Sequence, residues 1–319
     1  MSLLPRNWHA ILNPNSLIGG NPGLWHRTKQ LITQMGHIIT EWESPSKEVC
    51  DIIVSKILNE KPANIIVVGG DGTLNQVVNS IMNYDEAKNE ILLALIPAGT
   101  GNDWARTHHI PRRAGKLAEM FFNGEFFNHD IGRLSTSGEI GQSVLYFINI
   151  AGFGFDAEVI KRVQENPSAK NKWVYVKTLL AALADNMPVS CRLITDTGIN
   201  EAFVFTLAAG ICKFNGNGMK MVPMADPGDG KLDVVYIEPM TRWEIITQLP
   251  FLFMGKHISF KKVHHQQTRF LEIIPQGKLL AETEGEMAGV GNFKVTCLKN
   301  QLKILRPKTR KNNLYSLLV

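Results

Sequence analysis

The first third of the chain alternates short apolar runs with segments whose apolar residues recur at helical spacing. Residues 47–58, for example, place Val49, Ile53 and Ile57 along one face of a helix. The strand-like runs are 8–13, 37–42, 65–68 and 91–96. Strands that are apolar throughout and alternate with helices are typical of a parallel sheet covered on both faces. The pattern predicts a parallel α/β domain over residues 1–130.

Beyond about residue 130 the pattern changes to short strand-like runs separated by turn residues. Examples are CRLITD (191–196), KLDVVYI (231–237), NFKVTCL (292–298) and LKILRP (302–307). Many short strands at this spacing are typical of an antiparallel sandwich or meander, here with one helix expected at 173–186. We therefore predict a β-rich domain over residues 131–304. The last segment, 305–319, is expected to pack back on the first domain.

Two neighbouring predicted strands each end in a glycine-rich loop that leads into a helix. GGDGT (69–73) follows the strand at 65–68, and GTGND (99–103) follows the strand at 91–96. Glycine lets the backbone approach a ligand closely, and the free amides of a helix N-terminus favour an anion. Both loops, and Asn13 after an earlier strand, lie at carboxyl ends, which meet at the ligand-binding edge of such a sheet. The sequence therefore predicts a nucleotide or phosphate site at this edge.

The first loop alone has a second interpretation, a tight strand-to-helix turn in which Asp71 or Thr73 caps the helix. The chain has no Walker sequence (G-x-x-x-x-G-K-S/T). GFGFDA (152–157), the nearest match to a dinucleotide fingerprint, has alanine at the third position and lies among later strands. The pair of glycine loops is the more specific signal.

The combination of GGDGT (69–73) with PAGTGNDWAR (97–106) resembles the diacylglycerol kinase catalytic-domain family. That family includes soluble bacterial lipid kinases and sphingosine kinases, and is distantly related to NAD kinases and phosphofructokinases. The resemblance extends over nearly the whole chain. It implies a Rossmann-like, phosphofructokinase-like nucleotide domain and a β-sandwich domain for the lipid. It also implies ATP- and Mg²⁺-dependent transfer of the γ-phosphate to a lipid hydroxyl, of diacylglycerol, phosphatidylglycerol or a sphingoid base.

The resemblance also assigns the nucleotide site residue by residue. The residues expected to contact ATP are Asn13, Thr40, Gly69, Gly70, Asp71, Gly72, Thr73, Asn75, Thr100, Asn102 and Asp103. Of these, Asp71 and Asp103 are expected to face the phosphates and the catalytic magnesium, and Asp71 to be catalytic. Asp130 resembles a further acid of the family at the domain junction. The 13–23 loop is longer than the family's usual form, which leaves its contacts beyond Asn13 open.

A structural magnesium is implied in MADPGDGKLDV (224–234). By resemblance, Asp229 would bind it through its side chain, and Asp226 and Lys231 through backbone oxygens. A plain hairpin turn explains the Pro-Gly-Asp-Gly sequence equally simply.

The general base is assigned within ETEGEMAG (282–289). The family usually has Asp-Gly-Glu here, with the glutamate as base, and this chain has Glu284-Gly285-Glu286. We map the base to Glu286, which leaves the role of Glu284 open. The alternative is a polar hairpin turn without catalytic function.

The net charge of +5 is unevenly distributed. Residues 245–271 hold Lys256, Lys261, Lys262 and Arg269 but no acid, and residues 302–319 hold five bases and no acid. Such stretches suit an anionic membrane surface, although a solvated basic face is an equal alternative for each one. The sequence has no nucleic-acid-binding motif, so we expect no nucleic-acid partner.

The remaining composition suggests where the protein works. No apolar run approaches the ~20 residues of a membrane span, and no secretory leader is recognisable. The four cysteines are far apart in the sequence, and we expect them to be reduced thiols. We expect a cytoplasmic protein, peripherally associated with membrane, and exposed sheet edges make a homodimer plausible.

Two other functions stay open at this point. An NAD kinase-like enzyme would share GGDGT, but nothing like its later Thr-Pro-Thr-Gly-Ser-Thr motif is present. A non-catalytic nucleotide or lipid sensor on the same fold would have lost acids, whereas Asp71, Asp103, Asp229 and Glu286 are all retained. The lipid kinase is the leading interpretation.

Overall fold

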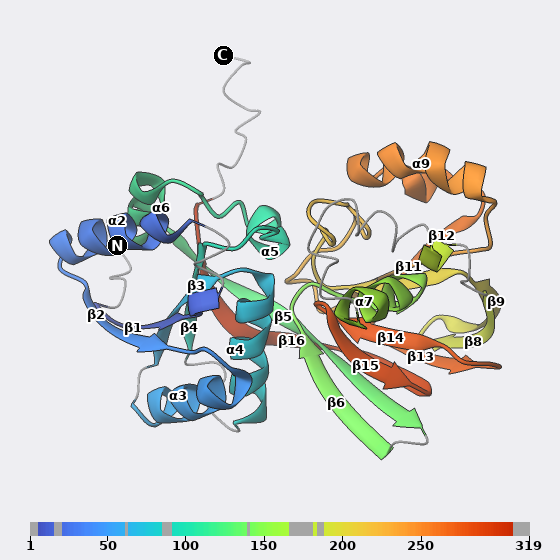
Figure 1. Cartoon of the computed structure of the whole chain (residues 1–319), viewed down its shortest axis with the longest axis horizontal. Coiled ribbons are helices and arrows are strands. Elements are labelled where there is room, and N and C mark those ends of the chain that lie inside the picture. The colour runs from blue at the N-terminus through green and yellow to red at the C-terminus, as the bar shows by residue number, and fades with distance from the viewer. Residues whose placement is uncertain are drawn as a thin grey trace, which may run out of the picture.

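The structure is a computed structural model that describes residues 6–15, 21–60, 63–84, 91–138, 141–165, 181–183 and 188–308. It contains two sheets, and the larger one runs through both halves of the molecule (Figure 1). The expected helix at 173–186 lies outside the described residues apart from 181–183.

The first half is built on parallel strands. Their order is β2 (Ile38–Glu43), β1 (Asn7–Leu12), β3 (Asn64–Gly69) and β4 (Leu92–Pro97). Every residue of β3 and β4 is buried, which explains why their sequences are apolar without alternation. Figure 1 shows helices on both faces of this sheet. They are α2 (Pro22–Gln34) and α6 (Ala114–Asn123) on one face and α3 (Lys47–Asn59) and α4 (Asp71–Asn83) on the other.

Antiparallel pairing carries the large sheet into the second half. The 15-residue strand β16 (Asn292–Arg306) lies parallel to β4 near one end and antiparallel to β5 (Glu125–Gly138) along most of its length. β6 (Gly141–Phe147) pairs with β5, and β13 (Phe270–Pro275), β8 (Val189–Thr195) and β9 (Gly198–Val204) continue the sheet beyond β16.

The second sheet is antiparallel throughout. Its order is β12 (Val263–Thr268), β11 (Leu232–Ile237), β10 (Thr206–Gly210), β7 (Ile150–Gly154), β14 (Leu280–Thr283) and β15 (Glu286–Val290). Phe153 of this sheet packs edge-to-face on Phe293 of the other, with ring centroids 5.2 Å apart. The predicted fold class, parallel α/β followed by an antiparallel β-sandwich, is confirmed.

Long strands join the two halves. β5 runs through residue 130 without a break, so the expected boundary falls inside a strand. The two runs expected at 292–298 and 302–307 form the single strand β16, with an irregularity at Asn300, whose φ is 53°. Lys303 and Ile304 pair with β4, while residues 309–319 lie outside the described part of the chain.

The structure also contains helices that the sequence pattern did not predict. They are α6, α7 (Phe155–Glu165) and α9 (Arg242–Met254), with a 3-10 turn at His257–Ser259. The helix expected after the second glycine loop is α5 (Asp103–Thr107), which has five residues. α9 contains Pro250 and is apolar on most sides, so it shows no clear helical periodicity.

Candidate active site

The two glycine loops lie in contact with each other. A Cβ on Gly99 would lie 2.5 Å from the Cα of Gly70, and a Cβ on Gly70 would lie 3.2 Å from the Cα of Gly99. The first distance is shorter than real Cβ contacts, so position 99 requires glycine, and the second is tighter than most such contacts. Neither residue has a positive φ. Gly70 and Gly99 therefore allow the two loops to approach closely, and neither is needed for a left-handed backbone conformation.

Asp71 joins the loops chemically. It is the first residue of α4, yet its carboxylate accepts hydrogen bonds from the backbone N–H groups of Asp103 (2.9 Å) and Trp104 (3.0 Å). An acid of the first loop thus caps the helix that follows the second loop. Sequence reasoning considered Asp71 as a cap of its own helix, whereas the structure uses it for α5.

The N-terminus of α4 itself has no side-chain cap, because its N-cap residue is Gly70. Space is open beside Gly72, where an added Cβ would meet nothing within 4 Å. Asn13 approaches from the end of β1, and its Nδ2 donates to Oγ1 of Thr73 at 3.3 Å. Uncapped amides at the start of a 13-residue helix favour an anion.

Asp103 connects this site to the second half of the chain. Its carboxylate forms an ion pair with Arg106 and accepts a hydrogen bond from the backbone N–H of Asn217, at 2.8 Å. Burial raises the pKa of Asp103, and the hydrogen bond from Asn217 opposes this shift. Sequence reasoning missed Asn217, because no local pattern indicates that its loop folds onto the first domain.

Glu284 enters the site from the β14–β15 turn. Glu284 and Gly285 have φ values of 52° and 85°, as a two-residue hairpin turn with two left-handed residues requires. The carboxylate of Glu284 accepts hydrogen bonds from the backbone N–H groups of Ile148 (3.2 Å) and Asn149 (2.5 Å) and from Asn149 Nδ2 (3.0 Å). Burial raises the pKa of Glu284 to about 7, and the charge of Asp71 adds to the shift.

Glu286, mapped from the sequence as the general base, occupies a different environment. It is the first residue of β15, and its side chain is exposed. The hairpin turn therefore places Glu284 inside the site and Glu286 at the surface.

Two acids, buried Glu282 and half-buried Asp156, support this hairpin. Glu282 accepts a hydrogen bond from the backbone N–H of Gly285, at 2.7 Å, and it shares a hydrogen bond with Asp156. Burial and the nearby charge of Asp156 raise the pKa of Glu282 well above its usual range. Asn215 Nδ2 donates to Asp156 at 3.1 Å, so the pair also holds the loop that reaches Asp103.

Some residues expected at the nucleotide do not face this space. Thr40 lies in the middle of β2, level with His9 and three residues before the strand ends at Glu43. Asn13 lies four residues beyond His9, so at about 3.3 Å per residue Thr40 is roughly 13 Å from the level of Asn13. The predicted strand was placed one residue too early at its end, and Ser44 is the polar residue that follows β2, with its N–H bonded to Leu12 O at 2.8 Å.

The other expected contacts divide between the surface and the interior. Thr100 is exposed in the second loop. Asn102 is buried in the left-handed conformation (φ 54°), and its Nδ2 donates to Gly99 O at 2.5 Å. Asn75 is also buried, and its side-chain oxygen accepts a hydrogen bond from Asn79 Nδ2. Asn75 and Asn102 thus support the loops from inside.

The Asp226–Lys231 segment is a turn held by an interior acid. Asp130 is fully buried, and its two oxygens accept the N–H groups of Gly230 (2.6 Å) and Asn300 (2.7 Å). Within the turn, Asp229 accepts the N–H of Lys231 at 2.9 Å. Carboxylate and backbone oxygens are ligands that suit Mg²⁺, and burial together with the charge of Asp226 raises the pKa of Asp229. The donor set thus fits a cation as well as a turn.

A buried cluster of His108, His129 and Cys212 lies behind α5, with one ligand atom of each within 4.8 Å of the others. The indole N–H of Trp104 donates to Nε2 of His129 at 3.1 Å, and Nδ1 of the same ring bonds Asp130 O. Burial lowers the pKa of His129 to about 4. Both ring nitrogens of His129 thus form hydrogen bonds, and its low pKa keeps the ring uncharged. We interpret the cluster as uncharged side chains that pack between the two halves.

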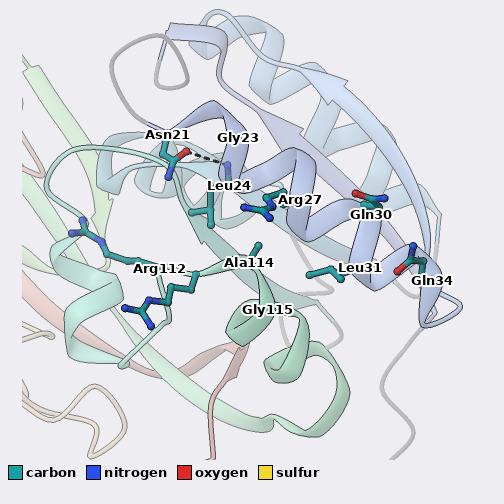
Figure 2. Close-up of a pocket in the computed structure, with 11 residues that line it drawn as sticks. Asn21, Gly23, Leu24, Arg27, Gln30, Leu31, Gln34, Arg112, Ala114 and Gly115 are labelled. Atoms are coloured by element: carbon teal, nitrogen blue, oxygen red, sulfur yellow. Dashed lines mark hydrogen bonds between the residues drawn. The ribbon is translucent and has the colours of Figure 1, made fainter.

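A pocket of about 700 Å³ adjoins the second glycine loop, between α2 and the start of α6 (Figure 2). Figure 2 shows Arg27 on one wall and Arg112 on the opposite side, and Arg113 also lines the pocket. Arg112 donates to Gly101 O at 3.4 Å. No acidic residue lines this pocket, which suits an anionic ligand, but Asp71 and Glu284 lie outside it.

Comparison with known proteins identifies relatives of both halves. The diacylglycerol kinase catalytic domain matches residues 7–134, and the YegS C-terminal NAD kinase beta sandwich-like domain matches residues 149–306. A diacylglycerol kinase of Mycobacterium tuberculosis is 27% identical over 246 residues, which cover 76% of this chain and 77% of the relative. A diacylglycerol kinase of Staphylococcus saprophyticus is 28% identical over 257 residues, covering 78% of each.

Solved structures share the fold at lower identity. The crystal structure of a diacylglycerol kinase from Bacillus anthracis has a TM-score of 0.69 at 15% identity, covering 94% of this chain and 97% of that chain. Yeast NADH kinase complexed with NADH has a TM-score of 0.54 at 10% identity, covering 98% and 86%. The chain therefore belongs to the diacylglycerol kinase catalytic-domain family and is a phosphotransferase of the lipid kinase type.

Proposed function

We propose that this protein transfers the γ-phosphate of ATP to the hydroxyl of a membrane lipid such as diacylglycerol. One observation carries the proposal. Asp71, which joins the two glycine loops of the first half, and Glu284, which comes from the second half, lie close enough for the charge of Asp71 to raise the pKa of Glu284. Phosphoryl transfer depends on such positioning and charge management.

The triphosphate of ATP would bind at the uncapped start of α4, beside Gly70, Gly72 and Thr73. The amides of that turn supply donors, and the glycines leave room for close approach. Asp71 and Asp103 would hold a catalytic magnesium, since each carboxylate has lone pairs beyond the hydrogen bonds it accepts. Mg²⁺ would neutralise charge on the phosphates. A second, structural magnesium would use Asp229 with backbone oxygens of Asp226 and Lys231.

A general base must accept the proton of the lipid hydroxyl. Glu284 suits this role better than Glu286, because it is half-buried among fixed N–H donors and has a pKa of about 7, near the working pH of most enzymes. Glu286 is exposed and stays the alternative. Asp71 would contribute through the metal and through the geometry of the loops.

A lipid substrate implies contact with a membrane, and we infer that the protein is a cytoplasmic enzyme that binds membrane peripherally. Among the described residues, no helix is long and apolar enough to cross a membrane. Of the basic residues expected to face lipid, Lys262 is paired with Glu244 at 2.8 Å and Arg306 with Glu125 at 2.8 Å. Lys256 and Lys261 are exposed and remain candidates.

The direct test is to incubate the protein with γ-labelled ATP, Mg²⁺ and a fractionated bacterial lipid extract, and to read which lipid acquires phosphate. Diacylglycerol, phosphatidylglycerol, a sphingoid base and NAD are added singly in parallel. We expect a labelled lipid, no labelled NAD, and loss of labelling by at least about 100-fold in Asp71→Ala. Glu119→Ala, which removes an exposed acid that forms an ion pair with Lys116, is the control and should label as the wild type does.

Each outcome discriminates between functions. Labelled NAD would favour the NAD kinase-like alternative. Binding of ATP without transfer to any of these acceptors would favour a nucleotide or lipid sensor. Full activity in Asp71→Ala would overturn the site.

A further inference from the structure

The helix α9 exposes apolar side chains where a helix of a soluble protein usually exposes polar ones. Large exposed apolar residues on α9 are Trp243, Ile246, Leu249, Phe251, Phe253 and Met254. The side chain of Trp243 is 77% exposed, and none of the 13 residues of the helix is buried. A concentration of exposed apolar residues on one element indicates an interaction surface.

Four of these residues lie on one face of the helix, together with Pro250. Trp243, Ile246, Pro250, Phe253 and Met254 recur at intervals of three or four residues, which places them along a single stripe. The opposite side holds α9 to the molecule. Leu252 packs against the smaller apolar core of the second half, and Phe251 meets Phe260 edge-to-face at 5.2 Å. The outward stripe is thus apolar by sequence, while the other side of α9 packs on the molecule.

Positive charge surrounds this stripe. Arg242, Lys256 and Lys261 lie at or just beyond the ends of α9, are exposed, and have no acidic side chain within 4.0 Å in the part of the chain that the structure describes. Glu244, the acid of the helix, forms an ion pair with Lys262, and its side chain accepts the backbone N–H of Thr241 in the capping box. An apolar stripe bordered by free cations is complementary to an anionic membrane surface, which offers hydrocarbon below a layer of phosphates.

The loop that contains Asn217 and Lys220 links α9 to the candidate active site. The N–H of Lys220 donates to Leu252 O at 3.1 Å, and three residues earlier the N–H of Asn217 donates to Asp103 at 2.8 Å. Figure 1 shows α9 on the same side of the molecule as α5, which begins at Asp103. A membrane in contact with α9 would therefore lie on the side from which a lipid can reach the site.

We propose that α9 is a membrane-docking helix that inserts its apolar face between the lipids of an anionic bilayer. The reason for docking rests on the proposed lipid kinase function, whereas the observations that support the docking surface do not depend on it. The residues that enter the lipid are Trp243, Ile246, Leu249, Pro250, Phe253 and Met254, and those that contact headgroup phosphates are Arg242, Lys256 and Lys261.

The test is sedimentation of the full chain with vesicles of phosphatidylglycerol or of phosphatidylcholine. We expect Trp243→Ala/Phe253→Ala to weaken binding to phosphatidylglycerol at least tenfold. The matched control is Ile199→Ala/Phe203→Ala, which removes two exposed apolar side chains from β9 and should bind normally. Lys256→Ala and Lys261→Ala should each weaken binding about fivefold, on anionic vesicles only.

Tryptophan fluorescence locates the contact. Vesicles should shift the emission of the wild type to shorter wavelength, and Trp243→Phe should keep binding but lose most of this shift. Wild-type binding by Trp243→Ala/Phe253→Ala, or equal loss in the β9 control, would overturn the proposal. So would a dimer in sedimentation equilibrium that the α9 variant alone converts to monomer while vesicle binding persists, because the stripe would then be covered by a second copy.

A water-soluble short-chain diacylglycerol separates this inference from the proposed function. The α9 variant should phosphorylate that monomeric lipid as the wild type does, yet lose activity on long-chain lipid in vesicles. A wild type that binds vesicles through α9 but phosphorylates no lipid would contradict the proposed function and leave the docking helix standing. Activity on vesicles unaffected by the α9 substitutions would contradict the docking helix alone.

Discussion

The acids of the candidate site have different surroundings. Asp71 accepts two backbone N–H groups, Asp103 is paired with Arg106, and Glu284 is held in a partly buried position by Asn149. Two glutamates separated by one glycine, Glu284 and Glu286, thus have opposite exposure. The hairpin turn that contains them directs Glu284 into the candidate site and Glu286 to the surface.

The pKa of Glu284 gives the first prediction. If Glu284 is the base, it acts only when ionised, so kcat/KM should rise with pH and level off above about 7. Glu284→Gln should lower kcat by about 10²–10⁴-fold and abolish that rise. Glu286→Gln is the matched control, and a pH–rate profile of the three proteins is the measurement. A flat wild-type profile between pH 5.5 and 8, or a larger loss in Glu286→Gln, would contradict the assignment.

At the scale of elements, the two glycine loops behave as one unit. Gly70 and Gly99 let the loops touch, and Asp71 ties the end of one to the helix after the other. The unit also receives Asn13 from a third strand. The edge of the sheet where we propose that the nucleotide binds is therefore built from interlocking turns.

Gly99→Ala tests this interlock. Its Cβ would lie 2.5 Å from Gly70 Cα and 3.0 Å from Gly70 N, and backbone atoms yield with difficulty. We expect a loss of about 1–3 kcal/mol in the free energy of unfolding. Gly72→Ala, in the same sequence motif but facing open space, should change stability by about 1 kcal/mol or less. Thermal unfolding of both variants is the measurement, and equal stabilities would show that the loops do not constrain each other.

At the scale of the whole molecule, β5 and β16 hold the halves together. They pair from Asn292 to Arg306, so the large sheet has no break at the expected domain boundary. Asp130, in the middle of β5, accepts N–H groups from the turn at Gly230 and from the irregular point of β16 at Asn300. One buried acid thus fixes three distant segments.

Asp130→Asn should therefore destabilise the whole chain. The amide replaces one acceptor by a donor that faces a buried N–H, at a cost of about 1–3 kcal/mol in the free energy of unfolding. Asp196→Asn is the matched control, because Asp196 also accepts two hydrogen bonds, from Thr268 and Arg269, but is exposed. Urea unfolding compares the two variants. A larger loss in Asp196→Asn would contradict the role of Asp130.

Much of this protein could be predicted from the sequence because the signals are local. The apolar run 65–68 predicts the strand β3, and the helical spacing of 47–58 predicts the helix α3. The glycine loops predict a phosphate site at the edge of the sheet. The order of strands and helices in the first half follows from that alternation. The family resemblance extended the same local motifs to an activity.

Only the tertiary structure decided the contacts between segments distant in sequence. Asn217 reaches Asp103, Asp71 caps α5, and Glu284 rather than Glu286 faces the site, because loops from both halves fold onto one edge. No local pattern encodes such pairings, since they depend on where strands end and how turns orient their side chains. The sequence by itself determined the elements and the chemistry available. The meeting of the halves decided which residues can use it.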